Sequence, residues 1–479
     1  MLTFAHPATY NEMASQPATS QVLKSEQTSE PEMLSSNRAG DRRAPRPRVR
    51  KGPHVLIEKL AATFPMKRGC PLELPQEYAR LRQESPVARV RLAFDGSEVW
   101  IVTGYREACA VLEDPRFSSD GVRAGFPRPM TMKPPPPGTF IRMDPPDHTR
   151  LRIAIAAEFK PNRIENLRAS IQRTVDKLLD EITALTPPVD LVDKFALPLP
   201  AMVVCDLLGV PYADRDFFHE RIRVIGLQSA SRSRHGEVRE ELEAHLFALA
   251  AIKEKEPEDD LLSRLIARHR QVGDITREEA VGIATLLLIA GYETLANMIA
   301  LGTVVLLENP DRLEELRRGP AKLAGAIEEL LRYQTVIMFG LRRAATADVE
   351  IGGTLIRAGE GVIVLLDAAN RDEAEFSDGD RFNMCREANH HLAFGHGIHA
   401  CIGQPLARLE LEIAWATLLR RIPTLQLAVP LAEIPFRNET FVYGVHKLPV
   451  KWQETHGYAG TRNRGSTREN EVADRSSSV

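Results

Sequence analysis

The sequence predicts a mainly helical protein with a small β part, which is an α+β fold class. Three observations support this prediction. Apolar residues recur at helical spacing through most of the chain, β-branched runs interrupted by glycine occur at two places, and one helical segment is apolar on nearly every side. Because such a helix has to be buried, the sequence also predicts a core built around it.

The composition of the 479-residue chain is that of a folded globular protein, with 43% hydrophobic and 27% charged residues. Its 62 basic and 65 acidic side chains leave a formal charge of −3, which gives no general attraction to nucleic acid or to an anionic membrane. Five cysteines without a CxxC pair argue against a disulfide scaffold and favour a reducing cytoplasm. No uninterrupted apolar run reaches the ~18 residues that cross a bilayer, so no membrane segment is expected.

Both ends of the chain are polar and poor in core-forming residues. Residues 1–53 are rich in Ser, Pro, Thr, Glu and Gln and close with a basic run, and residues 454–479 are rich in Gly, Ser and Arg. Such compositions bury too little apolar surface to fold, so we expect two disordered tails around one ordered domain, residues 54–453. The basic run could touch an anionic partner, although most such runs are simply solvated.

The ordered domain is expected to begin with strands and to continue with helices. Residues 87–94 and 98–103 are β-branched runs on either side of Asp95-Gly96, a dipeptide typical of a hairpin turn. Periodic apolar residues then predict helices over residues 162–184 and 237–252.

The most distinctive helix is expected over residues 276–308. Thr276 and Glu279 match the capping box that starts a helix, and Pro310 follows its end. At 1.5 Å per residue this helix is about 48 Å long, enough to cross the domain. After it, the pattern predicts a helix over 321–333 and a second strand pair over 349–351 and 354–366, punctuated by glycines.

The strongest functional signal is the pattern FxxGxHxCxG, which runs from Phe394 to Gly403 and places Cys401 in a glycine-rich loop. A helical stretch over residues 406–419 follows. Amides near a helix start can donate to an anionic sulfur, and such a loop can present a thiolate to haem iron. The alternative is a structural cysteine in a turn, which is our interpretation of the other four cysteines.

A second motif lies inside the long apolar helix, where Gly291, Glu293 and Thr294 occur together. Glycine weakens a helix, and an unpaired buried carboxylate costs several kcal/mol, so stability alone does not favour these residues. An acid and a reorientable hydroxyl within hydrogen-bond reach can deliver protons. The alternative is a solvated charge beside a hydroxyl bonded to its own helix.

Two further pairs of charged or polar residues share a helix face. Glu329 and Arg332 are spaced i,i+3, and His148 and Arg152 are spaced i,i+4 after a proline-rich segment. The second pair could clamp a carboxylate, because arginine offers a planar fork of donors. Each pair could equally be surface charge, which contributes little stability.

Taken in order, these motifs resemble those of soluble bacterial members of the cytochrome P-450 family, over roughly residues 60–453. The resemblance implies a P-450 fold whose long central helix crosses over a haem. It implies that Cys401 is the axial ligand of the haem iron, and that Glu293 and Thr294 are catalytic residues that relay protons while the helix loosens near Gly291. The implied haem-binding set is His148, Arg152, Arg343, Phe394, His399, Cys401 and Gly403, and the implied buried structural network is Glu329, Arg332 and Arg381.

The resemblance also implies a function. The chain is similar to monooxygenases that insert one oxygen atom of dioxygen into a small apolar molecule, by hydroxylation or epoxidation, in pathways such as secondary metabolism. The haem b is expected to be non-covalent, because the chain has no CxxCH site. No nucleotide-binding GxGxxG and no iron–sulfur cysteine set occurs, so electrons from NAD(P)H are expected through a ferredoxin or flavodoxin-type donor and its reductase. Such a donor is acidic, and its expected basic docking patch is Arg142, Arg150 and Arg408.

Two other functions are compatible with a haem-thiolate site. The chain also resembles the fungal nitric-oxide reductase branch of the family, which takes hydride directly from NADH, but that branch lacks a carboxylate at the position of Glu293. A haem-based ligand sensor is the third possibility, and the complete acid–alcohol pair argues against it. Substrate contacts are expected only by region, and these regions are 121–140, 217–236, 336–341 and Phe441-Val442.

Overall fold

The computed structural model describes residues 63–128, 136–226, 232–387, 389–438 and 441–453. Both expected tails, 1–53 and 454–479, lie outside the described residues. The chain divides into the units Met1–Ile57 and Glu58–Val479, and every described residue belongs to the second unit.

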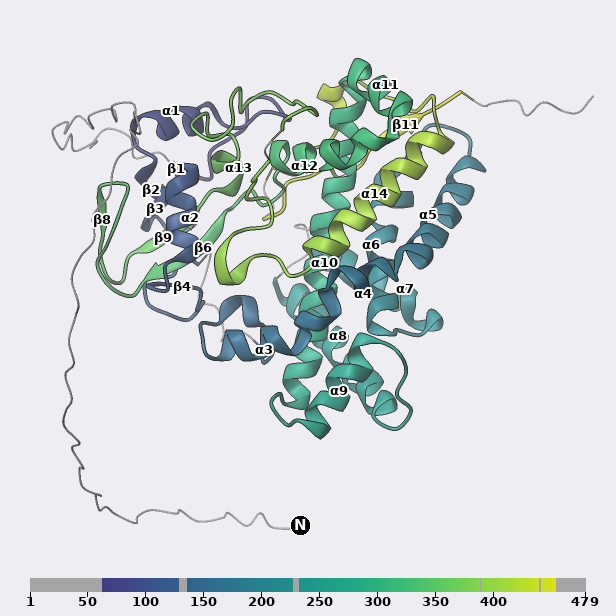
Figure 1. Ribbon diagram of the computed structural model, residues 1–479, viewed down its shortest axis with the longest axis horizontal. Helices are drawn as coiled ribbons and strands as arrows, with labels where there is room; N and C mark the ends of the chain where they lie inside the picture. Colours follow the sequence, from purple (N-terminus) through teal and green to yellow (C-terminus); the bar gives the residue numbers. More distant parts are fainter. Residues whose placement is uncertain (1–62, 129–135, 227–231, 388, 439–440, 454–479) are drawn as a thin grey trace, which may run out of the picture. The chain divides into compact units, whose positions relative to one another are not determined.

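Helices make up most of the described chain, which confirms the predicted fold class (Figure 1). They are α1 (Gln76–Glu84), α2 (Tyr105–Glu113), α3 (Asp147–Ala156), α4 (Pro161–Glu165), α5 (Arg168–Thr183), α6 (Pro198–Leu208), α7 (Arg215–Gly226), α8 (Arg232–Lys253), α9 (Leu261–Gln271), α10 (Arg277–Leu307), α11 (Pro310–Arg318), α12 (Leu323–Tyr333), α13 (Leu366–Ala369) and α14 (Gln404–Arg421).

The largest sheet lies on one side of the helices in Figure 1 and has six strands in the order β1-β2-β3-β9-β6-β4. The predicted hairpin is confirmed, because β2 and β3 pair antiparallel around Gly96, whose φ of 71° suits glycine. The six strands are β1 (Thr63–Phe64), β2 (Val87–Leu92), β3 (Glu98–Val102), β9 (Gly361–Val364), β6 (Leu341–Ala345) and β4 (Phe117–Ser118). A hairpin of β7 (Val349–Ile351) and β8 (Thr354–Ile356) and a three-stranded sheet of β10 (Gln426–Leu427), β11 (Pro449–Lys451) and β5 (Val189–Asp190) complete the β part.

Two predicted elements, one strand and one helix, are each divided into two in the structure. The strand expected over 354–366 divides at Gly359, where a φ of 84° turns the chain, so β8 pairs with β7 while β9 joins the large sheet parallel to β3. The helix expected over 162–184 divides into α4 and α5. Strand β6 was not expected from the sequence, and it pairs antiparallel with β9.

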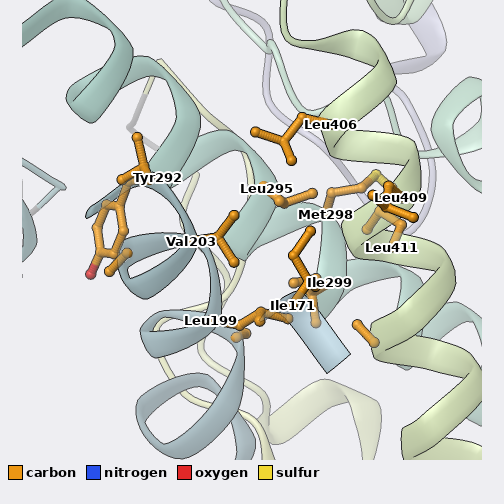
Figure 2. Packing of buried hydrophobic residues seen from close by; sticks show 14 of the residues in the cluster. Ile171, Leu199, Val203, Tyr292, Leu295, Met298, Ile299, Leu406, Leu409 and Leu411 are labelled. Atoms are coloured by element: carbon orange, nitrogen blue, oxygen red, sulfur yellow. The ribbon is translucent and has the colours of Figure 1, made fainter. Parts of the chain in front are cut away.

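Helix α10 forms the centre of the main hydrophobic core. Its capping box is present as predicted, since Thr276 Oγ1 accepts from the Glu279 amide at 3.1 Å and Glu279 Oε2 accepts from the Thr276 amide at 2.8 Å. Figure 2 shows Leu295 and Met298 of this helix facing Leu406 and other leucines of α14. The start of α14 is therefore packed against the middle of α10.

Among the described helices, α10 alone has the length and hydropathy of a membrane span, and 67% of its most apolar window is buried inside the protein. A core helix passes the same test of length and composition. The burial of α10 among α6, α8, α9 and α14 is that of a core helix.

Candidate active site

The loop that carries Cys401 is shaped by glycines and by the start of α14. Gly395 and Gly397 have φ values of 72° and 68°, and a Cβ on Gly397 would lie 2.5 Å from the carbonyl oxygen of Leu112. Only glycine fits this close approach to α2. The Cys401 amide donates to the Phe394 carbonyl at 2.7 Å, which closes the loop one turn before α14 begins.

The surroundings of Cys401 contain groups that stabilise a sulfur anion. The residue has exposed surface, yet it lies deep enough among protein atoms that burial raises the pKa of its thiol. The amides of Gly403 and Gln404 and the guanidinium groups of Arg152 and Arg408 act in the opposite direction and favour the thiolate. The predicted contribution of helix-start amides is therefore present in the geometry.

The Phe394 ring is in contact with a charged cluster. The guanidinium carbon of Arg408 is 4.6 Å from the centre of the Phe394 ring, and Arg408 also bonds Glu328 at 2.7 and 2.9 Å. Burial alone would raise the pKa of Glu328, but hydrogen bonds from His391 and Arg408 hold it at about 2. Arg408 is therefore already neutralised by a carboxylate of α12.

A second cluster gathers imidazoles and cations from three distant segments. The rings of His148 and His399 are 4.1 Å apart, and Arg343 of β6 is only 5% exposed. Burial lowers the pKa of His399 to about 3, with Arg343, His148 and Arg152 adding to the effect. Burial also lowers the pKa of Arg343, to about 10. The structure thus brings together four residues that the sequence placed in one haem-binding set.

Within the described residues, this cluster contains a buried imidazole without a hydrogen-bond partner, next to cations. His148 is 1% exposed, and neither of its ring nitrogens has a hydrogen-bond partner among the described residues. Arg152 donates to the carbonyl of Ala400 at 2.6 Å, a residue beside Cys401. Buried polar groups normally find partners, and the neighbouring cations favour a ligand with carboxylates.

The expected basic docking patch is not formed by three free charges. Arg150 bonds Glu279 of α10 at 2.7 and 2.9 Å, and Arg408 is held by Glu328 as described above. Arg142 lies 5.2 Å over the ring of Phe126, and burial lowers its pKa. The patch was expected from sequence position alone. Sequence position does not show that Glu279 of α10 pairs with Arg150 and that Glu328 of α12 pairs with Arg408.

The acid–alcohol motif lies next to an uncovered stretch in the middle of α10. Ala290 and Gly291 are exposed, whereas the adjoining Tyr292 is buried, and nothing lies within 4 Å of the position of a Cβ on Gly291. The expected loosening of the helix is absent, because α10 runs unbroken from Arg277 to Leu307. Thr294 donates to the carbonyl of Ala290 at 2.8 Å, a bond that its hydroxyl can exchange for another acceptor by rotation.

Glu293 is paired with a residue that the sequence did not indicate. Arg437 Nη2 donates to Glu293 Oε1 at 2.6 Å, and the two side chains are 8% and 22% exposed. Their separation of 144 residues leaves no local signal, such as helical spacing, that could have connected them. Glu293 is therefore neither a solvated surface charge nor an uncompensated buried one.

The Glu329–Arg332 pair is buried, but the third member of its network is not Arg381. Arg332 bonds both carboxylate oxygens of Glu329, at 2.7 and 2.8 Å, and Arg386 Nε bonds Glu329 at 3.1 Å. Arg381 has an exposed side chain and contributes only its carbonyl, which accepts from Arg332 at 3.0 Å. Arg386, five residues after Arg381, reaches the carboxylate instead.

Two of the expected substrate regions lie side by side. Val336, Ile337 and Met338 run along Phe441, Val442 and Tyr443, with a β-bridge between Ile337 and Val442 and a 3.1 Å bond from the Met338 amide to the Phe441 carbonyl. Phe441 is 41% exposed. The other two regions fall partly outside the described residues, at 129–135 and 227–231.

These residues fit the haem that the sequence resemblance implies. Cys401 has exposed surface and a thiolate-stabilising environment, the buried His148 has unsatisfied nitrogens beside cations that suit two propionates, and α10 leaves Ala290 and Gly291 uncovered. The buried imidazole without a partner would be unfavourable in a protein that used these segments only for packing.

Comparison with known proteins gives a consistent result. A cytochrome P-450 family model matches residues 323–452. The chain is 47% identical to cytochrome P-450-SU2 of Streptomyces griseolus over 82% of this chain and 97% of that protein, and 41% identical to the 20-oxo-5-O-mycaminosyltylactone 23-monooxygenase of Streptomyces fradiae over 81% and 92%. The crystal structure of cytochrome P-450 MoxA from Nonomuraea recticatena is similar with a TM-score of 0.78 at 45% identity, covering 83% of this chain and 100% of that one. The chain belongs to the cytochrome P-450 family.

Proposed function

We propose that this protein is a haem-thiolate monooxygenase that inserts one oxygen atom of dioxygen into a small apolar molecule, by hydroxylation or epoxidation, in secondary metabolism. Membership of the family gives an oxidoreductase with haem b and dioxygen as cofactors and NAD(P)H as the indirect electron source. The relative named as a 23-monooxygenase supports oxygen insertion as the reaction. The apolar substrate is supported by Met338 and Phe441, which lie on the two adjoining substrate regions.

In this proposal, Cys401 binds the haem iron, and the haem supplies the oxidising chemistry once electrons reach it. The Gly403 and Gln404 amides stabilise the sulfur as an anion, and Phe394 shields it from water. His148, Arg152, Arg343 and His399 hold the propionates, which gives the imidazole N–H of His148 an acceptor. The Glu329–Arg332–Arg386 network holds the segment before the cysteine loop, because Asn383 and Asn389 also bond Glu329.

Proton delivery is assigned to Glu293 and Thr294 of α10. The Thr294 hydroxyl rotates from the Ala290 carbonyl to donate toward the uncovered face, and Glu293 replaces the proton from solvent. Glu293 also separates this chain from the nitric-oxide reductase alternative, whose sequence pattern lacks the carboxylate. Electrons are proposed to arrive from a ferredoxin or flavodoxin-type donor in the cytoplasm.

The observation that carries the proposal is the unsatisfied imidazole and cation cluster beside a thiolate-stabilising cysteine loop. It is tested by reducing the purified holoprotein under carbon monoxide and recording the difference spectrum. We expect the long-wavelength band of thiolate ligation in the native protein and its loss in Cys401→Ser, with Cys385→Ser as the matched control. An unchanged band in Cys401→Ser, or consumption of nitric oxide with NADH alone, would contradict the assignment.

A further inference from the structure

The C-terminal loop of the domain is fixed directly on the catalytic segment of α10. A Cβ on Gly444 would lie 1.6 Å from Oδ1 of Asn297, so the loop backbone touches the helix one turn after Glu293. The Arg437 amide donates to the Gly444 carbonyl at 2.8 Å, and Phe436 and Val445 form a β-bridge. Arg437 is therefore held at a defined place above α10 by its own backbone.

The side chain of Arg437 binds Glu293 in partly dehydrated surroundings, where an ion pair is strong. Its Nη2 is 2.6 Å from Glu293 Oε1, and the arginine side chain is only 8% exposed. A charge-assisted bond in partly dehydrated surroundings is stronger than one at the surface, and it fixes both charge and direction. Asn297 bonds the Glu293 carbonyl at 2.8 Å, so the backbone of the acid is fixed from the other end.

We propose that Arg437 is the positioning residue of Glu293: it holds the carboxylate in place and ionised at rest, so that the carboxylate takes up a proton from solvent and passes it to Thr294 after the Thr294 hydroxyl has given up its own. The inference rests on the proposed oxygenase function and adds to it a residue from a separate segment of the chain. Phe441 and Val442, which belong to an expected substrate region, lie between the bridged residues Phe436 and Val445. The residues expected to contact substrate and the arginine that positions Glu293 are therefore close in sequence.

The direct test is an infrared titration of the holoprotein, with the Glu293 carboxyl band isolated by subtracting the spectrum of Glu293→Gln. In Arg437→Gln we expect the midpoint to rise by about 1 to 3 pH units, the effect of losing a cation in contact with a carboxylate. Arg437→Lys should restore most of the shift. Lys447→Gln removes an exposed cation from the same loop and should leave the midpoint unchanged. His446 is another titratable group beside Arg437, and its imidazole does not contribute a carboxyl band.

A second readout measures the consequence for proton delivery. With ferredoxin and reductase, Arg437→Gln should release a several-fold larger share of NADH electrons as hydrogen peroxide than the native protein or Arg437→Lys. In a Glu293→Gln background the Arg437→Gln substitution should add nothing, because its effect acts through Glu293. Equal infrared midpoints in the native protein and Arg437→Gln, or additive effects in the double variant, would overturn the proposal. A normal carbon-monoxide band in the same samples shows that the haem-thiolate assignment itself stands.

Discussion

Two Glu–Arg pairs of this protein, one fully buried and one partly buried, are built in opposite ways. Glu329 and Arg332 are one helical turn apart, and both are at most 1% exposed. Glu293 and Arg437 are 144 residues apart, and Glu293 retains 22% exposure. The first pair is enclosed by further donors from Asn383, Arg386 and Asn389.

The difference shows what each pair is suited to do. A fully enclosed carboxylate with several fixed donors cannot exchange protons with water without breaking the surrounding structure, so it serves to hold segments together. A carboxylate that keeps some contact with water, and is held by an arginine of another segment, can change its protonation at lower cost. The second arrangement suits catalysis, and the following predictions test the contrast.

The largest effect is expected from Glu329→Gln, which leaves Arg332 and Arg386 as buried cations without their carboxylate. Breaking such a pair costs about 3–5 kcal/mol, so we expect loss of most soluble holoprotein and a much lower denaturant midpoint. The matched control is Glu314→Gln, which removes a carboxylate from a surface pair with Arg318 and should change stability little. If Glu329→Gln is as stable as the control, Glu329 does not have the structural role assigned to it.

A smaller effect is expected at low pH from Glu328, the neighbour of Glu329 on α12. Because its pKa in the folded protein is lowered to about 2, the ionised pair with Arg408 stabilises the fold above the ordinary pKa of a glutamate. This stabilisation, at most about 3 kcal/mol and less because Arg408 is partly solvated, is lost as pH falls toward 2. The free energies of unfolding of the native protein and Glu328→Gln, measured by denaturant titration, should therefore differ at neutral pH and converge as the pH falls. The variant Glu387→Gln, at an exposed position, should have the native free energy of unfolding at every pH.

Next in size is the comparison of Arg386→Gln with Arg381→Gln, which tests the corrected network directly. Arg386 bonds the buried Glu329, so its loss should cost about 1–3 kcal/mol. Arg381 contributes its carbonyl and has an exposed side chain, so its loss should stay within about 0.5 kcal/mol. The midpoints of thermal unfolding of the two variants, measured under one condition, test this. A larger loss of stability in Arg381→Gln than in Arg386→Gln would show that Arg381 belongs to the network after all.

The smallest effect on stability, and a large one on catalysis, is expected from Thr294→Ala. Its hydroxyl bonds only the Ala290 carbonyl among the described contacts, a group of the same helix, so the unfolding free energy should change by less than about 1 kcal/mol. Electrons should instead be diverted from product to hydrogen peroxide. Measuring product and peroxide per NADH consumed checks this, and full coupling in Thr294→Ala would contradict the role given to the hydroxyl.

Local patterns predicted much of the fold. The capping box of Thr276 and Glu279, the hairpin at Gly96 and the buried rod of α10 depend on residues close in sequence, and each is confirmed. Other features depend on pairing between distant segments. Strand β6, which was not predicted, pairs with β9 and β4, and β9 pairs with β3 rather than with its sequence neighbour β8.

The candidate site shows the same division. Spacing alone predicted that Glu329 and Arg332 share a face and that His148 and Arg152 follow one another on α3. Spacing could not show that Arg386 rather than Arg381 binds Glu329. It also could not show that Arg150 and Arg408 are already paired with Glu279 and Glu328. These contacts depend on how loops and helices pack.

By itself, the sequence determined the chemistry that this protein offers: one cysteine in a glycine-rich loop, an acid and an alcohol in an apolar helix, and imidazoles and arginines spaced to bind carboxylates. Only the tertiary structure decided which charges meet, and it placed Arg437 on Glu293 across 144 residues. The reason is physical. Helical spacing and turn chemistry act over a few residues, whereas an ion pair between segments exists only after both are fixed by the packing of a common core.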